Sequence, residues 1–133
     1  MKNIFAIGDQ KVYKKIITRD DEAAFHGERV HPVYATFALA RDFEWSSRLF
    51  FIEMKEKDEE GVGTLLHIEH KGPAFAGEEV VITATVEKQE GMELICAIEA
   101  KVGSRMIATG RTGQRMLKVE QLKGIFSKSG HDR

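Results

Sequence analysis

The hydrophobic pattern of this chain changes period once, near residue 63, and few folds accommodate such a change. Before that point, residues 37–55 have a composition that favours a helix. At about 100° per residue around a helix axis, one stripe collects mostly apolar and small side chains: Thr36, Ala40, Phe43, Ser47, Phe50 and Met54. The charged residues that fall away from it are Arg41, Asp42, Arg48 and Glu53. The pattern predicts one long helix with one buried face.

After residue 63 the side chains alternate between apolar and polar, as they do in strands that bury one face. The alternating runs cover residues 66–70, 80–86, 94–102 and 106–119. Short segments that contain glycine separate these runs, which is typical of hairpin or near-hairpin connections. Gly110 and Gly113 interrupt the last run and indicate a bulge or a bend. We predict a four-strand antiparallel meander after the helix.

The remaining segments complete the order of elements. Residues 11–18 are rich in β-branched and aromatic side chains and predict a first strand, whereas residues 19–32 are expected to form a loop or a short helix. The charged run 55–61 ends in glycine and is expected to be a solvated exit from the long helix. The polar tail 118–133 predicts a short terminal helix that then frays.

A sheet with one apolar face needs a cover, and this chain supplies a single long helix for that purpose. A curved antiparallel five-stranded sheet wrapped around one long central helix is the economical arrangement, and this α+β architecture is the hotdog fold. The chain length of 133 residues suits one such domain, which we expect to span residues 1–133. Because many hotdog domains differ in activity, function must be inferred from individual side chains.

Charge and cysteine content argue against several functional classes. The 20 basic and 21 acidic residues leave a formal net charge of −1, so no overall field favours nucleic acid or an anionic membrane. Charged residues interrupt the apolar-rich stretch 37–54, which argues against a membrane span. Cys96, the single cysteine, forms no internal disulfide, and the chain does not open on a signal-peptide pattern. We therefore expect a cytoplasmic protein.

Metal binding is disfavoured by the positions of the possible ligands. His67 and His70 point to opposite faces of one strand, and the sequence contains no Cys-x-x-Cys motif and no helical histidine pair. Cys96 belongs to the apolar set of its strand and is expected to be unreactive packing.

Several short motifs between residues 33 and 119 match one family of enzymes. They are Tyr34-Ala35-Thr36, Phe43-Glu44-Trp45, Gly61-Val62-Gly63-Thr64, His70, Gly77 and the segment 107–115. By these motifs the chain resembles the fluoroacetyl-CoA-thioesterase-like branch of the hotdog thioesterases. In that family a threonine that opens the helix, a glutamate eight residues later and a histidine on the next strand form the catalytic set. Thr36, Glu44 and His70 stand at that spacing.

The resemblance implies hydrolysis of a short or medium acyl-CoA thioester, without a cofactor, by a homodimer, with a tetramer left open. It also implies substrate contacts at Phe37, Gly63 and Thr64, and a contact of Arg115 with the phosphates of coenzyme A. For Arg115 the alternative is an ordinary solvated charge. The backbone N–H of Gly63, or one at the helix N-terminus, is assigned to the developing oxyanion. Gly63 alternatively serves only the turn into its strand.

Each proposed catalytic residue also has a plain structural explanation. Glu44 lies about 80° around the helix from Thr36 and two turns further on, at the border of the buried face. Partial desolvation there would make its carboxylate a better base. The alternative is an ordinary surface glutamate. His70 shares a strand face with Leu66 and Ile68 and so points at the helix, where it either transfers protons or is a hydrogen-bonded core residue. Thr36 attacks the thioester, orients the attacking group, or simply caps the helix.

Departures from the family pattern support an alternative function. Phe37 follows Thr36 where many members carry proline, Ala74-Phe75 replaces a common Thr-Pro, and no histidine precedes Arg115. A non-catalytic acyl-CoA-binding or ligand-sensing hotdog module is therefore the second hypothesis. A hotdog dehydratase ranks last, because its His/Asp arrangement is not found.

Overall fold

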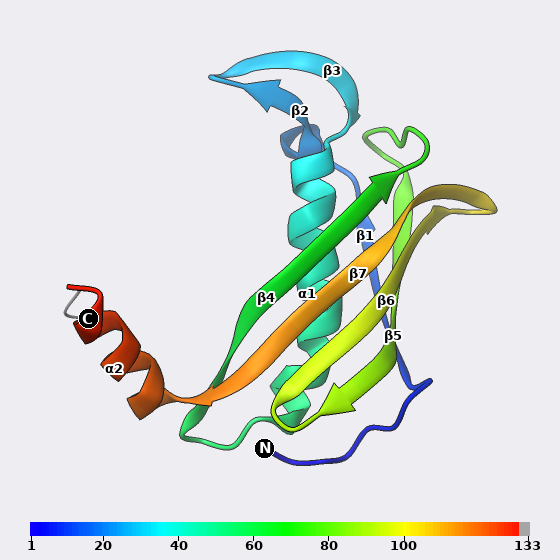
Figure 1. Ribbon diagram of the computed structural model, residues 1–133. Helices are drawn as coiled ribbons and strands as arrows, with labels where there is room; N and C mark the ends of the chain where they lie inside the picture. The colour runs from blue at the N-terminus through cyan, green and yellow to red at the C-terminus, as the bar shows by residue number, and fades with distance from the viewer. Residues whose placement is uncertain (131–133) are drawn as a thin grey trace.

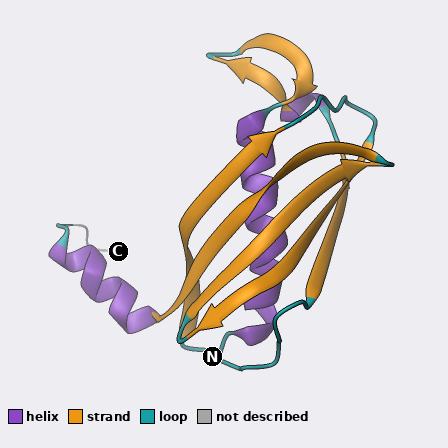
Figure 2. Ribbon diagram, turned by 45° about the vertical axis from the view of Figure 1, so that its right-hand side comes forward, coloured by secondary structure: helices purple, strands orange, loops and turns teal. Residues whose placement is uncertain are grey.

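The computed structural model describes residues 1–130 and forms a sheet wrapped around one long helix (Figure 1). The elements are β1 (Gln10–Ile16), η1 (Arg19–Asp21), β2 (Glu22–Phe25), β3 (Glu28–Tyr34), α1 (Thr36–Met54), β4 (Glu59–His70), β5 (Glu79–Glu90), β6 (Glu93–Val102), β7 (Arg105–Lys118) and α2 (Val119–Lys128). The five-stranded antiparallel sheet has the order β1-β5-β6-β7-β4. Figure 2 shows the sheet curving around α1, so the predicted α+β hotdog architecture is confirmed.

The predicted four-strand meander is wrong in one respect. Strands β5, β6 and β7 do follow one another as hairpins, but β4 pairs with β7 and occupies the edge of the sheet. The connection 71–78 carries the chain from this edge to β5, beyond β7 and β6. The alternation of apolar and polar side chains predicts which face of a strand is buried, but not which strand lies beside it. The pattern therefore does not predict the order of strands in the sheet.

Residues 19–34 contain a two-stranded hairpin where a loop or a short helix was predicted. The short helix is present as η1, but β2 and β3 then pair around a turn at His26 and Gly27, whose φ values are 54° and 81°. Two consecutive residues with positive φ suit a two-residue hairpin. The turn lacks the usual Asn-Gly or Asp-Gly signal, and Pro32 within β3 is unusual for a strand. These features explain the missed prediction.

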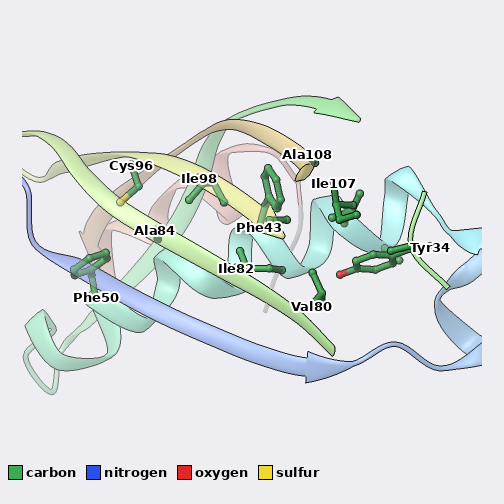
Figure 3. Close-up of a cluster of buried hydrophobic side chains, with 14 of the residues drawn as sticks. Tyr34, Phe43, Phe50, Val80, Ile82, Ala84, Cys96, Ile98, Ile107 and Ala108 are labelled. Carbon is green, nitrogen blue, oxygen red and sulfur yellow. The ribbon is translucent and has the colours of Figure 1, made fainter. Parts of the chain in front are cut away.

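The long helix is confirmed, but its buried face differs from the predicted stripe. Phe43, Phe50 and Met54 are fully buried against the sheet, as Figure 3 shows for the two phenylalanines. Thr36, placed on the stripe, is exposed at the end of the helix, whereas Asp42, placed away from it, is only 3% exposed. A buried carboxylate is stable only when it is paired, and periodicity alone cannot reveal such a pair.

Asp42 lies in a polar cluster that joins β1, η1 and β3 to the first half of α1. Lys15 Nζ lies 3.0 Å from Asp21 Oδ1 and 3.2 Å from Asp42 Oδ2. Arg41 Nη2 donates to Asp21 Oδ1 at 2.6 Å, and the hydroxyl of Tyr34 donates to Asp42. Burial alone would raise the pKa of Asp21, but hydrogen bonds from the Thr18 backbone, Arg41 and Lys15 lower that pKa below its ordinary value. The cluster therefore fixes the chain that leads into Thr36.

The charged run 55–61 is only partly solvated, contrary to the prediction. Strand β4 already begins at Glu59, which is 1% exposed and lies 2.9 Å from the amino group of Met1. At Gly61 an added Cβ would lie 2.4 Å from the ring of Phe51, so the strand packs directly on α1. The ion pair of Glu59 with Met1 and the packing of Gly61 on Phe51 therefore bury part of a run that is mostly charged in the sequence.

Two irregularities lie near the bulge or bend predicted from Gly110 and Gly113: Ile107 is an extra residue of β7 opposite β6, and β4 has a second one. The register between β4 and β7 shifts between Gly63 and Leu65, which leaves Thr64 as the extra residue. Gly110 permits a close approach of the two backbones, because an added Cβ would lie 1.9 Å from the carbonyl oxygen of His67. The terminal helix is confirmed as α2; the last three residues of the tail lie outside the described residues.

Candidate functional site

Thr36 and His70 form a hydrogen-bonded pair at one end of the molecule. Thr36 is the first residue of α1 and His70 the last residue of β4, and Thr36 Oγ1 lies 3.0 Å from His70 Nδ1. The expectation that Thr36 caps the helix is wrong, because Ala35 occupies the N-cap position and no side chain caps the helix. A hydroxyl beside an imidazole suits proton transfer and the activation or orientation of a nucleophile.

An apolar hollow of about 550 Å³ opens beside this pair. Its walls come from the β2–β3 hairpin, the start of α1 and the end of β4: Ala23, Phe25, His31, Ala35, Thr36, Phe37, Ala40, Leu66 and Ile68. Phe25 and Phe37 meet edge to face, with ring centroids 5.8 Å apart. Thr36 is thus the reactive group in the wall of a hollow that suits a small apolar group. The contribution of the hairpin was not anticipated, because the hairpin itself was not predicted.

Glu44 lies at a second, smaller hollow of about 180 Å³, which we call the Glu44 hollow. It is lined by Arg41, Glu44, Trp45, Arg48, Gly63, Thr112, Gly113 and Gln114. The side chain of Glu44 is exposed in the single chain, so the predicted partial burial is not found there. An added Cβ on Gly63 would lie 3.8 Å from Glu44 Oε1. A Cβ at this position would be in ordinary van der Waals contact with the carboxylate, so β4 approaches Glu44 closely at Gly63.

One chain brings Thr36 and His70 together but does not bring Glu44 to them. Eight helical residues separate Glu44 from Thr36, or about 12 Å along the helix axis. Glu44 sits beside Gly63, and His70 lies seven residues further along the same strand, about 20 Å away. The three residues of the expected catalytic set therefore do not come together within a single chain.

The two arginines nearest to Glu44 along the helix are engaged elsewhere. Arg41 Nε lies 3.1 Å from Asp42, and its Nη2 lies 2.6 Å from Asp21. Arg48 donates to the carbonyl of Gly61 at 3.2 Å and to Glu60 at 2.8 Å. Among residues 1–130 no ion pair involves Glu44 itself. Its carboxylate therefore remains available to accept a proton.

Thr64 and Arg115, the other predicted substrate contacts, lie apart from the Thr36–His70 pair. Thr64 is exposed at the register shift, where its Oγ1 would lie 3.0 Å from a Cβ added to Gly113. Arg115 is exposed, whereas its neighbours Gln114 and Met116 are buried on the helix-facing side. Alternation thus places Arg115 on the outer face of the sheet, so a contact with coenzyme A stays a prediction.

Other chemistries find little support in the described part of the chain. No group of three or more histidine, cysteine or acidic side chains within residues 1–130 could hold a metal ion. Burial raises the pKa of Cys96 to about 12, so the thiol stays protonated in the core. A polar hollow of about 610 Å³ on the outer sheet face contains the Arg111–Glu87 ion pair and lies away from Thr36 and His70. None of the helices described between residues 1 and 130 is both long and apolar enough to span a bilayer.

The chain is similar in sequence and in fold to known proteins. The family model described as "FlK: Fluoroacetyl-CoA-specific thioesterase" matches residues 17–120. A hypothetical protein of Thermus thermophilus, described as a thioesterase superfamily member, is 28% identical, with a TM-score of 0.90 over 96% of this chain and 95% of that chain. A hot-dog-like protein of Thermanaerovibrio acidaminovorans is 18% identical, with a TM-score of 0.87 over 97% and 96% of the two chains.

A third structure, a variant of FlK in complex with acetyl-CoA, is 18% identical, with a TM-score of 0.85 over 94% of this chain and 98% of that chain. No curated protein sequence matches this chain significantly.

Proposed function

Because the chain belongs to the fluoroacetyl-CoA-specific thioesterase family, we propose that it hydrolyses the thioester of a short or medium acyl-CoA. The observation that carries this proposal is the Thr36–His70 hydrogen bond of 3.0 Å at an apolar hollow of about 550 Å³. The hollow suits the acyl group, and the pair suits the proton transfers of hydrolysis. The acetyl-CoA complex of an FlK variant supports the substrate class.

The proposed roles follow from what thioester hydrolysis requires. His70, held by Thr36, supplies the proton that the departing thiolate takes up. Glu44 acts as the base that activates a water molecule. The first-turn N–H groups of α1 have no partner within the helix and lie beside Thr36, so they suit the developing oxyanion, with the N–H of Gly63 as the alternative donor.

We propose that the complete site needs a second copy of the chain, because Glu44 is too far from His70 in one copy. Strand β4 is an open edge of the sheet, with Leu65 and Leu66 being 47% and 40% exposed. Such an edge favours pairing with another strand. If two copies pair through β4 about a two-fold axis, the strands run antiparallel. The His70 end of one copy then approaches the Glu44 hollow of the other.

Exposed apolar residues on α1 support the same arrangement. Phe37, Trp45 and Ile52 are 49%, 42% and 48% exposed and fall within about 80° of one another around the helix. Glu44 and Arg48 lie on the same side of the helix, at the hollow bordered by Gly63 of β4. A partly apolar surface of this kind next to an open edge fits an interface between two copies.

The test is release of free thiol from a panel of acyl-CoA thioesters, from acetyl to octanoyl. We expect turnover of at least one member, and loss of it in Glu44→Gln and in His70→Ala. Both variants should keep the oligomeric state and melting temperature of the wild type. A folded wild-type protein that turns over no member of the panel would contradict the proposal.

Because Glu44 lies far from His70 in one chain, the alternative function without catalysis also needs a test. A non-catalytic acyl-CoA-binding or ligand-sensing module would bind acyl-CoA without releasing thiol. Calorimetric titration of the same panel distinguishes the two functions. Binding with no thiol release over hours would favour the module and reject the hydrolase.

A further inference from the structure

Thr112 carries a buried hydroxyl that has no hydrogen-bond partner. It lies in β7, where Thr112, Gln114 and Met116 are all buried on the helix-facing side. Thr112 is 1% exposed, and its Oγ1 is the one buried side-chain oxygen or nitrogen within residues 1–130 that lacks a partner. An unpaired buried hydroxyl costs free energy, and a valine of the same shape would avoid that cost. Packing alone therefore does not explain a threonine at this position.

Thr112 lies in the wall of a hollow that it shares with Glu44. Thr112 lines the Glu44 hollow together with Glu44 and Gly63. The volume of about 180 Å³ accommodates a few water molecules. It is about a third of the volume of the apolar hollow of about 550 Å³, which suits the acyl group. The Glu44 hollow is thus a small space with several polar side chains in its wall, and an ordered water there needs two or more polar partners.

Among the polar groups around this space, the Glu44 carboxylate and the Thr112 hydroxyl are open to such a water. Gln114 Nε2 already donates to Ser47 Oγ at 3.0 Å. Arg41 and Arg48 bind carboxylates and a carbonyl outside the hollow. Within residues 1–130 the carboxylate of Glu44 has no ion pair and the hydroxyl of Thr112 has no hydrogen bond. A carboxylate that accepts and a hydroxyl that donates form a pair that can hold and orient one water.

We propose that Thr112 holds the water molecule that attacks the thioester and that Glu44 takes the proton of this water. The inference rests on the proposed hydrolase function and adds a residue to it. The water oxygen forms a bond to the acyl carbon, and the carbon–sulfur bond breaks. One proton of the water passes to Glu44, and the thiolate leaves with a proton from His70 of the second copy in the proposed dimer, because His70 of the same chain lies too far from Glu44. The products are a carboxylic acid and a free thiol.

The first test compares Thr112→Val, which keeps the shape and removes the hydroxyl, with Thr112→Ser, which keeps the hydroxyl. We expect kcat for thiol release to fall about 10- to 100-fold in Thr112→Val with KM nearly unchanged. Its melting temperature should equal or exceed that of the wild type, because an unpaired buried hydroxyl is removed. Thr112→Ser should retain most of the wild-type kcat. Thr109→Val is the matched control on the outer face of the same strand and should leave kcat unchanged.

A wild-type kcat in Thr112→Val would overturn the inference. So would a loss of kcat that accompanies a lower melting temperature and is not restored by serine, since that result indicates a structural role. A crystal structure of the wild type that resolves ordered water separates this inference from the proposed function. The structure could show a water within hydrogen-bond distance of both Thr112 Oγ1 and Glu44 while the protein releases no thiol. That result would reject the proposed hydrolase function and support the water site. A hollow without such a water would reject the water site.

Discussion

Thr36 Oγ1 lies 3.0 Å from His70 Nδ1, and this contact joins the first residue of α1 to the last residue of β4. The two residues are 34 positions apart in the chain and meet because β4 crosses the helix diagonally and ends near the helix start (Figure 1). Thr36 lines the apolar hollow, and His70 adjoins this hollow through its contact with Thr36.

If Thr36 orients His70, the two residues act as one unit. We expect His70→Ala to lower kcat about 100-fold or more, Thr36→Ala to lower it by a smaller factor, and the double variant to resemble His70→Ala. Thr36→Ser should retain most activity because it keeps the hydroxyl. Steady-state thiol release measures all four variants. Losses that multiply in the double variant would show that the two residues act independently.

A site shared between two copies can be tested by mixing two inactive variants. If Glu44 of one copy serves His70 of the other, a dimer of one Glu44→Gln chain and one His70→Ala chain keeps one intact site. Equal mixtures, unfolded and refolded together, should recover about a quarter of the wild-type activity. Each variant refolded alone serves as the control. No recovery in mixtures shown to contain mixed dimers would place the complete site within one chain.

The size of the apolar hollow should set the preference for acyl length. Each buried methylene contributes about 0.8 kcal/mol, so kcat/KM should rise about fourfold per carbon until the hollow is full. Ala40 lines the hollow from α1, and Ala40→Phe should fill part of it. We expect that variant to lose activity toward hexanoyl-CoA by about 10-fold or more while acetyl-CoA turnover changes little. Equal losses for both substrates would argue against an acyl group in this hollow.

The close approach of β4 and β7 at Gly110 should make that glycine essential for stability. An added Cβ would meet the backbone carbonyl of His67 at 1.9 Å, and a backbone atom cannot move aside as a side chain can. We expect Gly110→Ala to lower the free energy of unfolding by about 3 kcal/mol or more, measured by urea denaturation. Gly124→Ala is the control, because nothing lies within 4 Å of its added Cβ. That variant should be neutral or slightly more stable.

The polar cluster around Asp21 predicts a defined pH dependence of stability. The pKa of Asp21 lies below its ordinary value of 3.8, so its ionised form stabilises the fold above that pH. This contribution is lost as the pH falls through the lowered pKa. Asp21→Asn should cost about 1.5–3 kcal/mol at pH 7, and its difference from the wild type should shrink below about pH 4. Asp20→Asn is the control and should change little, whereas a constant difference down to pH 2 would contradict the assignment.

Most of the helices and strands, and the inward faces of the strands after the long helix, could be predicted from the amino-acid pattern. The change from helical to alternating periodicity predicted α1 and the strands β4 to β7. Apolar side chains on a buried face recur about every 3.6 residues in a helix and every second residue in a strand. The need to cover an apolar sheet with one helix then led to the α+β hotdog fold. The motifs that resemble one thioesterase family identified Thr36, Glu44 and His70 as the expected catalytic residues.

Contacts between segments that are distant in the chain became known from the folded structure. Pairing of β4 with β7 left an open edge, and ion pairs allowed Asp42 and Glu59 to be buried. The structure also joined Thr36 to His70, set Glu44 apart from them, and left the hydroxyl of Thr112 unpaired within residues 1–130. Periodicity reports how each segment faces the core, whereas hydrogen bonds and ion pairs depend on the distance between side chains, which exists only once the chain has folded.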